Sequence, residues 1–299
     1  IWVSLVPLGL ALYGATAKQG TWLGGCFGTV LWISQTWGLH TTLIHQPGMP
    51  WWVSVVFWLS LCVLAGIPYL VFGLLITKLN WIEKPAGALR TAFLWVGLTE
   101  WIPSLAPVFP VHALSQQAVW LQIVHWGGTP TLHLLLVWVN WLIVHSFLRF
   151  KHDYRRLKNH LILIALIPVI IVGWGSYELY RNKNEPHKEL KIGWVQPNFT
   201  SIPNGQNGVT KDQLQHLLKQ SAELIQTDPK IKAVFWPEVP FPLSWVDQVE
   251  QRQQIRQAVV KWQRPLFIVS STVDNPKVIL GEQFAYYNVA QMIGSTGIV

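Results

Sequence analysis

The sequence predicts a multi-span α-helical membrane domain followed by a smaller α/β domain. Only 12% of the 299 residues are charged, about half the share of roughly 25% found in soluble domains. Mean hydropathy is +0.31, and the chain contains 19 Trp residues, a residue type that favours membrane interfaces. Long apolar runs fill the first part of the chain, whereas charged residues and shorter strand-like runs follow.

Six apolar segments define the membrane domain, which we expect to comprise residues 1–180. Most of them approach the roughly 20 residues that a helix needs to cross the hydrocarbon layer, although the first and fourth are shorter. The segments are Ile1–Ala15, Thr21–Leu39, Trp51–Ile76, Ala86–Ile102, Thr129–Leu148 and His160–Tyr180.

Basic residues occupy every second connection between these segments. They are Lys18, then Lys78, Lys84 and Arg90, and then Arg149, Lys151, Arg155, Arg156 and Lys158. The connections at 40–50 and 103–128 contain no Lys or Arg. Since basic loops stay in the cytoplasm, we expect everything after Tyr180 to lie outside it. Membrane orientation then accounts for the net charge of +8, and we expect no nucleic-acid partner.

From about Arg181 the chain alternates between strand and helix patterns, which predicts an α/β layered domain at residues 187–299. The expected strands are Leu190–Val195, Ala233–Trp236, Leu266–Thr272 and Tyr286–Ile293. One helix is expected after a cap at Thr210, and a second runs from a cap at Ser244 to about Trp262. The apolar face of the first helix comprises Leu214, Leu217, Leu218, Leu224 and Ile225.

Glu238 is the candidate catalytic residue. It follows an apolar strand, and Pro240 and Pro242 prevent regular structure from continuing. The carboxyl end of a buried strand is where α/β proteins build their sites. The neighbouring Trp236 and prolines favour a partly dry setting, which suits a carboxyl group that acts as a general base. The alternative is an ordinary surface acid after a strand.

Two further polar runs are candidates to accompany Glu238. Gln196-Pro197-Asn198 ends the first strand, and its side-chain amides are expected at the same edge of the sheet as Glu238. Tyr286-Tyr287-Asn288 supplies polar groups that enter the last strand. The alternatives are an ordinary turn and a structural Tyr-Asn pair, respectively.

Glu100 lies near the outer end of the fourth apolar segment. A charge at membrane depth is a functional candidate, but a residue at this position can also reach the interface. We leave both readings open.

The remaining residue types that bind metals or cofactors form no pattern. Cys26 and Cys62 each lie in an apolar run, and we expect both to be small buried hydrophobes. His133 and His145 are expected to pack within the helix bundle. No His has ligand spacing, so we expect no metal and no cofactor.

Short motifs spread along the whole chain resemble those of one family. They are Trp37-Gly38-Leu39, Thr99-Glu100-Trp101, Phe109-Pro110, Ser115-Gln116, Gly127-Gly128 with Asn140, Val195-Gln196-Pro197-Asn198, Trp236-Pro237-Glu238 and Tyr287-Asn288. In their order they resemble apolipoprotein N-acyltransferase, a bacterial multi-pass enzyme of the inner membrane. The resemblance implies a nitrilase-like α-β-β-α fold, partly present at 187–299, on the periplasmic side. One departure is Val111, where the family usually has Trp after Phe-Pro.

The resemblance also implies a reaction. The family moves an acyl chain from a phospholipid to the N-terminal amine of diacylglyceryl-cysteine apolipoproteins, and a cysteine thioester carries the chain. Its triad is Glu-Lys-Cys, and Glu238 matches the Glu. The Lys and Cys are expected beyond Val299, so we expect this chain to be truncated at both ends and inactive by itself. The alternatives are a membrane-bound nitrilase-type amidase and a non-catalytic membrane scaffold.

Overall fold

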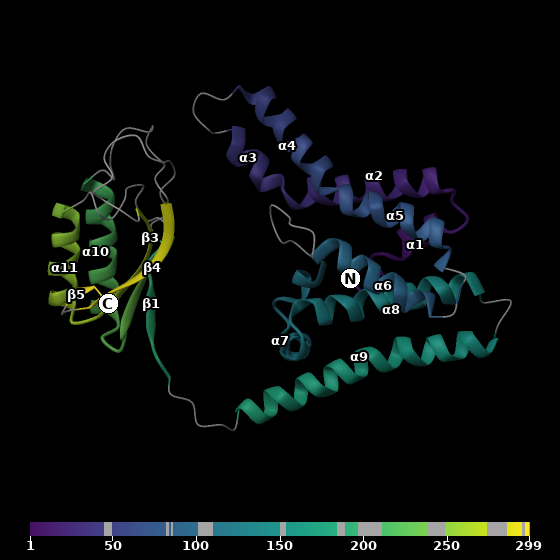
Figure 1. The fold of residues 1–299 in the computed structure, drawn as a ribbon. Helices are drawn as coiled ribbons and strands as arrows, with labels where there is room; N and C mark the ends of the chain where they lie inside the picture. The colour runs from purple at the N-terminus through teal and green to yellow at the C-terminus, as the bar shows by residue number, and fades with distance from the viewer. Residues whose placement is uncertain are drawn as a thin grey trace. The chain divides into compact units, whose positions relative to one another are not determined.

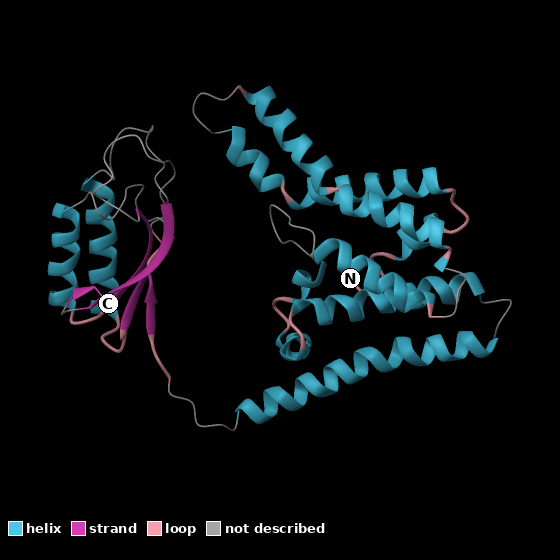
Figure 2. Ribbon diagram, viewed as in Figure 1, coloured by secondary structure: helices cyan, strands magenta, loops and turns pink. Residues whose placement is uncertain are grey.

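The chain folds into two compact units, Ile1–Glu185 and Pro186–Val299 (Figure 1). The computed structural model describes residues 1–44, 50–81, 84, 86–100, 110–149, 154–183, 189–196, 211–238, 249–273, 286–294 and 297–298. The first unit is helical, and the second combines helices with one sheet (Figure 2). The predicted order of a helical part followed by an α/β part is therefore confirmed.

Each of the six predicted apolar segments contains a helix. The helices are α1 (Val6–Leu12), α2 (Ala17–Gln35), α3 (Trp37–Ile44), α4 (Trp51–Ala65), α5 (Ile67–Leu79), α6 (Gly87–Glu100), α7 (Ala118–Leu121), α8 (Thr129–Arg149) and α9 (Tyr154–Lys183), with 3-10 turns at Pro110–Leu114 and Gln122–Trp126. Among the described residues, three stretches are long and apolar enough to cross a membrane: Trp51–Leu79, Thr129–Leu148 and Leu157–Lys183. Crossing by the other three segments stays a prediction.

The segment predicted as one helix over Trp51–Ile76 has a break at Gly66, between α4 and α5. Pro68 lies in the first turn of α5, where its missing N–H costs no hydrogen bond. The α2–α3 junction is tied to α4 at Thr36. The Thr36 hydroxyl accepts a hydrogen bond from Trp58 Nε1 at 2.9 Å and donates to the Trp32 carbonyl at 2.6 Å.

Glycines let α2 and α5 approach closely. Gly20, Gly24 and Gly28 recur every fourth residue and are buried on one face of α2. A Cβ at Gly24 would lie 2.1 Å from the carbonyl oxygen of Tyr69, and one at Gly73 would lie 2.0 Å from that of Gly20. Backbone atoms are in contact here, so any larger side chain forces the helices apart. Small residues at this spacing are a common packing device in membranes.

The two cysteines differ in burial. Cys62 on α4 is buried, as predicted. Its sulfur lies 3.5 Å from Thr36 Oγ1. Cys26 is exposed, so the expectation that it is buried was wrong. The glycine face of α2 turns toward α5, and Cys26 lies off that face.

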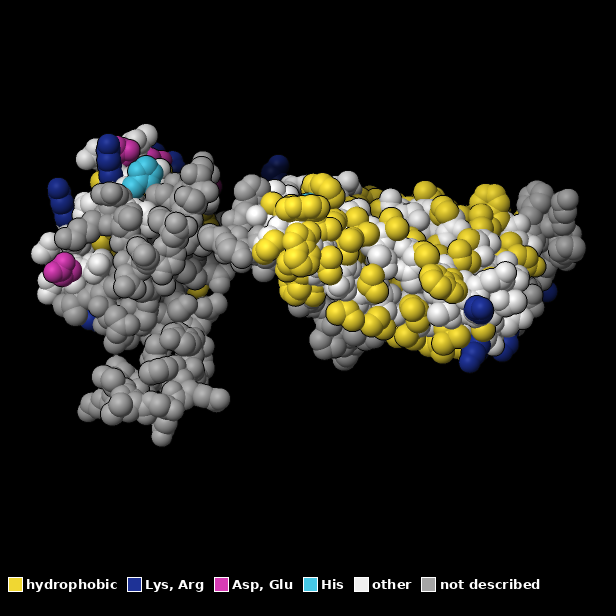
Figure 3. Space-filling view, turned by 90° about the horizontal axis from the view of Figure 1, so that it is seen from above, with side chains coloured by type: hydrophobic (Ala, Val, Ile, Leu, Met, Phe, Trp, Pro, Cys, Tyr) yellow, Lys and Arg dark blue, Asp and Glu magenta, His cyan; other side chains and the backbone are white. Residues whose placement is uncertain are grey.

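The outside of the helical unit is apolar. Figure 3 shows hydrophobic side chains gathered over this unit. Trp22, Trp51 and Phe147 are each 67% exposed, and only 17% of the most apolar window of α9 is buried. Many exposed apolar side chains on one unit are suited to lipid rather than to water.

The α/β unit contains one mixed sheet. Its elements are β1 (Ile192–Trp194), α10 (Lys211–Thr227), β2 (Ala233–Glu238), α11 (Val249–Trp262), β3 (Leu266–Val273), β4 (Tyr286–Gly294) and β5 (Gly297–Ile298). The strands lie in sequence order; β1, β2 and β3 are parallel, and β4 and β5 are added antiparallel. All four predicted strands are present. The predicted cap at Ser244 lies outside the described residues.

The two faces of this sheet differ. Helices α10 and α11 lie side by side on one face (Figure 1). The core there contains Leu214, Leu217, Val234, Trp236, Ile255, Val259, Leu266 and Ile268. The predicted apolar face of α10 is confirmed, since Leu218, Leu224 and Ile225 also pack against this core. Three aromatic rings from adjacent strands stack in a row: Trp194 and Phe235 have centroids 6.2 Å apart, and Phe235 and Phe267 4.5 Å.

Candidate functional site

Glu238 is the last residue of β2, which lies between the parallel strands β1 and β3. Phe235 pairs with Phe267, and Glu238 pairs with Val269. Three steps along β2 therefore match two steps along β3, which is the signature of a bulge. The bulge contains Pro237, which has no N–H to give to the ladder. The backbone thus carries Glu238 to the carboxyl end of a central parallel strand.

Trp236 lies within this bulge and anchors β2. Its side chain is 2% exposed, and its Nε1 donates a hydrogen bond to Ser221 Oγ on α10 at 2.9 Å. Ser221 in turn donates to the Leu217 carbonyl at 2.7 Å. The indole is therefore part of the core between the sheet and α10, and its hydrogen bond holds β2 in position relative to this helix.

The backbone brings other predicted site residues to the same edge. Val269, the partner of Glu238, pairs on its other side with Ala290, and Asn288 lies two residues before Ala290 on β4. Gln196 follows β1 and is exposed. Pro197 and Asn198 lie outside the described residues. Asn288 and Gln196 thus lie at the edge where β2 ends.

The opposite edge of the sheet carries a structural ion pair. Asp228 accepts a hydrogen bond from Lys191 Nζ, and its second oxygen accepts one from the Lys230 N–H at 3.0 Å. The bond from Lys191 and then that from Lys230 hold the pKa of Asp228 below its usual value. Arg264 Nε donates to the Ile231 carbonyl at 2.6 Å. These contacts fix the turn that leads into β2.

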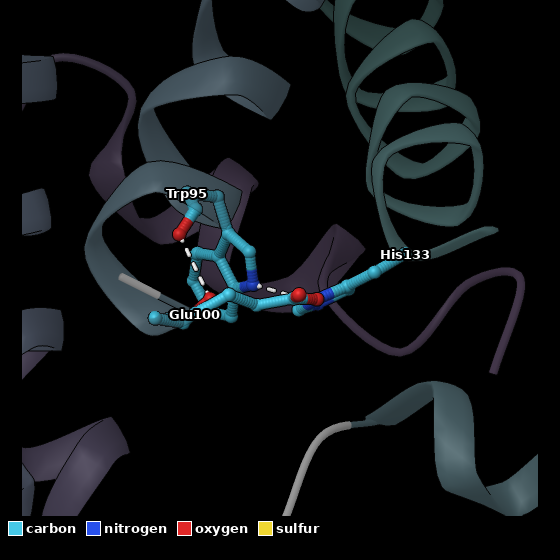
Figure 4. A network of polar contacts seen from close by, with 4 residues as sticks. Trp95, Glu100 and His133 are labelled. Carbon is cyan, nitrogen blue, oxygen red and sulfur yellow. Dashed lines mark hydrogen bonds and ion pairs between the residues drawn. The ribbon is translucent and has the colours of Figure 1, made fainter. Parts of the chain in front are cut away.

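A second polar cluster lies inside the helical unit (Figure 4). Glu100 Oε1, at the end of α6, is 2.6 Å from His133 Nδ1 on α8. Trp95 Nε1 donates to His133 Nε2 at 3.2 Å. The side chain of His133 is 0% exposed and that of Glu100 is 6% exposed. Glu100 therefore turns inward to a histidine, which decides against the reading in which it reaches the interface.

The hydrogen bonds define the tautomer of His133. An indole N–H can only donate, so His133 Nε2 accepts and the ring proton is on Nδ1. Nδ1–H then donates to the Glu100 carboxylate, in the manner of charge-assisted pairs. Burial of His133 was predicted, but its contact with Glu100 was not, because 33 residues separate them.

No group of three His, Cys, Asp or Glu side chains within the described ranges is arranged to hold a metal ion.

These features define a class of protein: a membrane-type helical domain joined to an α/β unit with a carboxylate at a strand end. A family model described as "Apolipoprotein N-acyltransferase N-terminal domain" matches residues 1–142. Through residues 1–142 the chain is therefore similar to the N-terminal domain of the apolipoprotein N-acyltransferase family. Comparison with curated proteins gives no match. The family match and the three apolar stretches together indicate a membrane protein that resembles an acyltransferase family.

Proposed function

We propose that this protein transfers an acyl chain from a phospholipid to the N-terminal amine of diacylglyceryl-cysteine apolipoproteins. The observation that carries the proposal is the family match over residues 1–142, followed in the same chain by a parallel β-α-β-α-β arrangement whose central strand ends in Glu238. The reaction needs a lipid-facing domain and a polar site on one polypeptide, and the two units meet these needs.

The α/β unit is proposed to have a nitrilase-like fold. Its sheet has helices on one face and the aromatic row of Trp194, Phe235 and Phe267 on the other. Trp194 is 60% exposed. In an α-β-β-α arrangement a second sheet packs on such a face, about 10 Å away. The aromatic row, in which Trp194 is exposed and Phe235 and Phe267 are partly exposed, supports this layering.

In the proposed chemistry, Glu238 moves protons in two half-reactions. A cysteine thiolate attacks the phospholipid ester carbonyl, and the protonated Glu238 gives its proton to the departing lysophospholipid oxygen. The apolipoprotein amine then attacks the thioester carbonyl, Glu238 takes the amine proton, and the thiolate leaves. A lysine ammonium stabilises both oxyanions. We assign neither the cysteine nor the lysine to a residue of this chain.

The proposed location is the inner membrane, with the α/β unit on the periplasmic side. The basic residues near the start of α6 and of α9, including Lys84, Arg90, Arg155 and Lys158, support a cytoplasmic placement of these connections. Both substrates of the proposed reaction are anchored in lipid, and the apolar exterior of the helical unit allows them to approach laterally.

The test is Glu238→Gln in the protein as the cell makes it. Gln keeps the size and one carbonyl oxygen but cannot exchange a proton, so we expect N-acylation of lipoproteins to fall by about 10²–10⁴-fold, the usual contribution of general acid–base catalysis. Mass spectrometry of lipoprotein N-termini measures the product. Glu250→Gln, which changes an exposed acid at the start of α11, is the matched control and should be neutral.

The two alternatives predict different results. Ammonia release from small amides that is lost in Glu238→Gln, with no lipoprotein acylation by the unchanged protein, would establish an amidase. Acylation that is equal in both proteins would contradict the proposed role of Glu238. A scaffold predicts neither lipoprotein acylation nor ammonia release by the unchanged protein.

A further inference from the structure

A cavity of about 310 Å³ lies at the end of the helical unit where α6 and α9 begin and α8 ends. A water molecule occupies about 30 Å³ in the liquid, so the cavity holds a group the size of several waters. Three helices contribute to its wall. Trp138, Leu142 and Leu163 give it an apolar side, so its lining is amphipathic.

The polar side of the cavity is built from hydrogen-bond donors. Lys84 supplies a positive charge, and His145, Asn159 and His160 supply ring or amide nitrogens. His145 is 3% exposed, and its ring lies 5.9 Å from that of His160. No Asp or Glu occurs among the described residues that line the cavity. This chemistry favours an anion.

The first turn of α6 adds a second source of positive potential. Gly87, Ala88 and Leu89 line the cavity, and the amino end of a helix carries about half a positive charge with N–H groups that point outward. Gly87 makes the approach feasible, since a Cβ there would lie 2.9 Å from His145 Cε1 and 1.8 Å from the Trp81 carbonyl oxygen. The helix end is thereby held against the histidine.

We propose that this cavity binds an anionic phosphate group. A lysine, N–H donors on neutral side chains and a helix amino end form a set that suits phosphate. The apolar side and the lipid-facing exterior of α9 suit the glycerol end of a phospholipid, and basic pockets between membrane helices do bind lipid headgroups. Free phosphate shares the same chemistry. The proposal does not depend on the acyl-transfer reaction.

The experiment measures binding by native mass spectrometry of the whole chain, stripped of lipid in detergent. The probes are dioleoyl phosphatidylglycerol, dioleoylglycerol, which lacks the phosphate, and inorganic phosphate. We expect phosphatidylglycerol to bind and dioleoylglycerol to bind at least about tenfold more weakly. Lys84→Gln should weaken phosphatidylglycerol binding about fivefold, the effect of one basic residue near a lipid headgroup.

Lys158→Gln is the matched control. Lys158 is an exposed cation in the first turns of α9, but it does not line the cavity. It should change binding less than twofold. Unchanged helicity of Lys84→Gln by circular dichroism shows that the fold is retained, and His160→Phe, which replaces a second lining residue, should weaken binding as well.

The probes separate the two sources of phosphate. Displacement of phosphatidylglycerol by millimolar inorganic phosphate, with equal binding of phosphate alone, would support the site and assign it to the free anion. Equal binding of dioleoylglycerol and phosphatidylglycerol would overturn the proposal. An equal loss in Lys84→Gln and Lys158→Gln would also overturn it, because general surface charge would then explain the binding.

Discussion

His133 Nδ1 and Glu100 Oε1 lie 2.6 Å apart, and neither side chain is more than 6% exposed. The pair joins the end of α6 to the start of α8. Trp95, on the same helix as Glu100, donates a hydrogen bond to the second ring nitrogen of His133. The two contacts together define the orientation of the His133 ring and the position of its proton on Nδ1. Removal of one partner therefore has a different cost from removal of both.

We expect His133→Leu to be the more damaging of the two single substitutions. It leaves the Glu100 carboxylate buried without its partner, at a cost of about 3–5 kcal/mol. Glu100→Leu leaves a neutral N–H without its acceptor on Glu100, at a cost of about 1–3 kcal/mol. The measurement is the free energy of unfolding in mixed detergent. The double variant should lose less than the sum of the singles, and strict additivity would contradict the pairing.

Two adjacent glycines on α2 provide a matched test of helix approach. A Cβ at Gly24 would lie 2.1 Å from a backbone oxygen, whereas the nearest atom to a Cβ at Gly25 would be Leu70 Cδ1 at 3.5 Å, an ordinary contact. Gly24→Ala should destabilise the helical unit by about 1–3 kcal/mol. Gly25→Ala should be neutral or stabilise by up to about 1 kcal/mol through helix propensity. Thermal unfolding of both variants in detergent measures the difference, and equal behaviour would contradict the close approach.

Asn140 has a structural role that a substitution can test. Its Oδ1 accepts from the buried Leu5 N–H at 2.9 Å, and its Nδ2 donates to the Leu136 and Ile1 carbonyls. Asn140→Leu should cost about 1–3 kcal/mol because the Leu5 N–H loses its acceptor. Hydrogen exchange at Leu5 should then accelerate. Ser146→Ala, which removes a buried hydroxyl from the same helix, should leave exchange at Leu5 unchanged.

The Lys191–Asp228 pair predicts a pH dependence for the α/β unit. The native pKa of Asp228 lies below its usual value, so the pair stabilises the fold above the unfolded carboxyl pKa of roughly 3.9. That stabilisation is lost as the pH falls through the native pKa. Asp228→Asn should lower the unfolding temperature slightly at pH 7, since the pair is exposed.

The difference between Asp228→Asn and the unchanged protein should shrink as the pH is lowered from 7 toward 3. Thermal unfolding at several pH values follows it, with Glu223→Gln as the control for loss of an exposed acid. A stability difference that grows as the pH falls would contradict the lowered pKa of Asp228 and the stabilising role of its pair with Lys191.

The sequence predicted the elements of the α/β unit well, because strand and helix periods there are strong. Leu214 and Leu217 were predicted on the buried face of α10 and lie there. Periodicity was less informative in the helical unit, where both faces are apolar and lipid replaces water. For that reason it missed the break at Gly66 and the exposure of Cys26.

Contacts between distant segments were outside the reach of pattern reasoning. Glu100 and His133 were each noticed, but nothing in their spacing joined them. The glycine repeat at positions 20, 24 and 28 is a sequence pattern that indicates close helix packing. The catalytic role of Glu238 stays a prediction, since the backbone supplies its place in the strand and not its chemistry.

The bulge before Glu238 interrupts the alternation of β2 residues between the two faces of the sheet. Val234 and Trp236 are buried on the helix side of the sheet, and uninterrupted two-residue alternation would count position 238 with them. The extra residue in the bulge interrupts this alternation, so position 238 pairs with Val269 instead. Loss of the bulge at unchanged strand length would return position 238 to the alternation of Val234 and Trp236. The placement of the acid in the sheet therefore depends on the bulge as well as on the residue type.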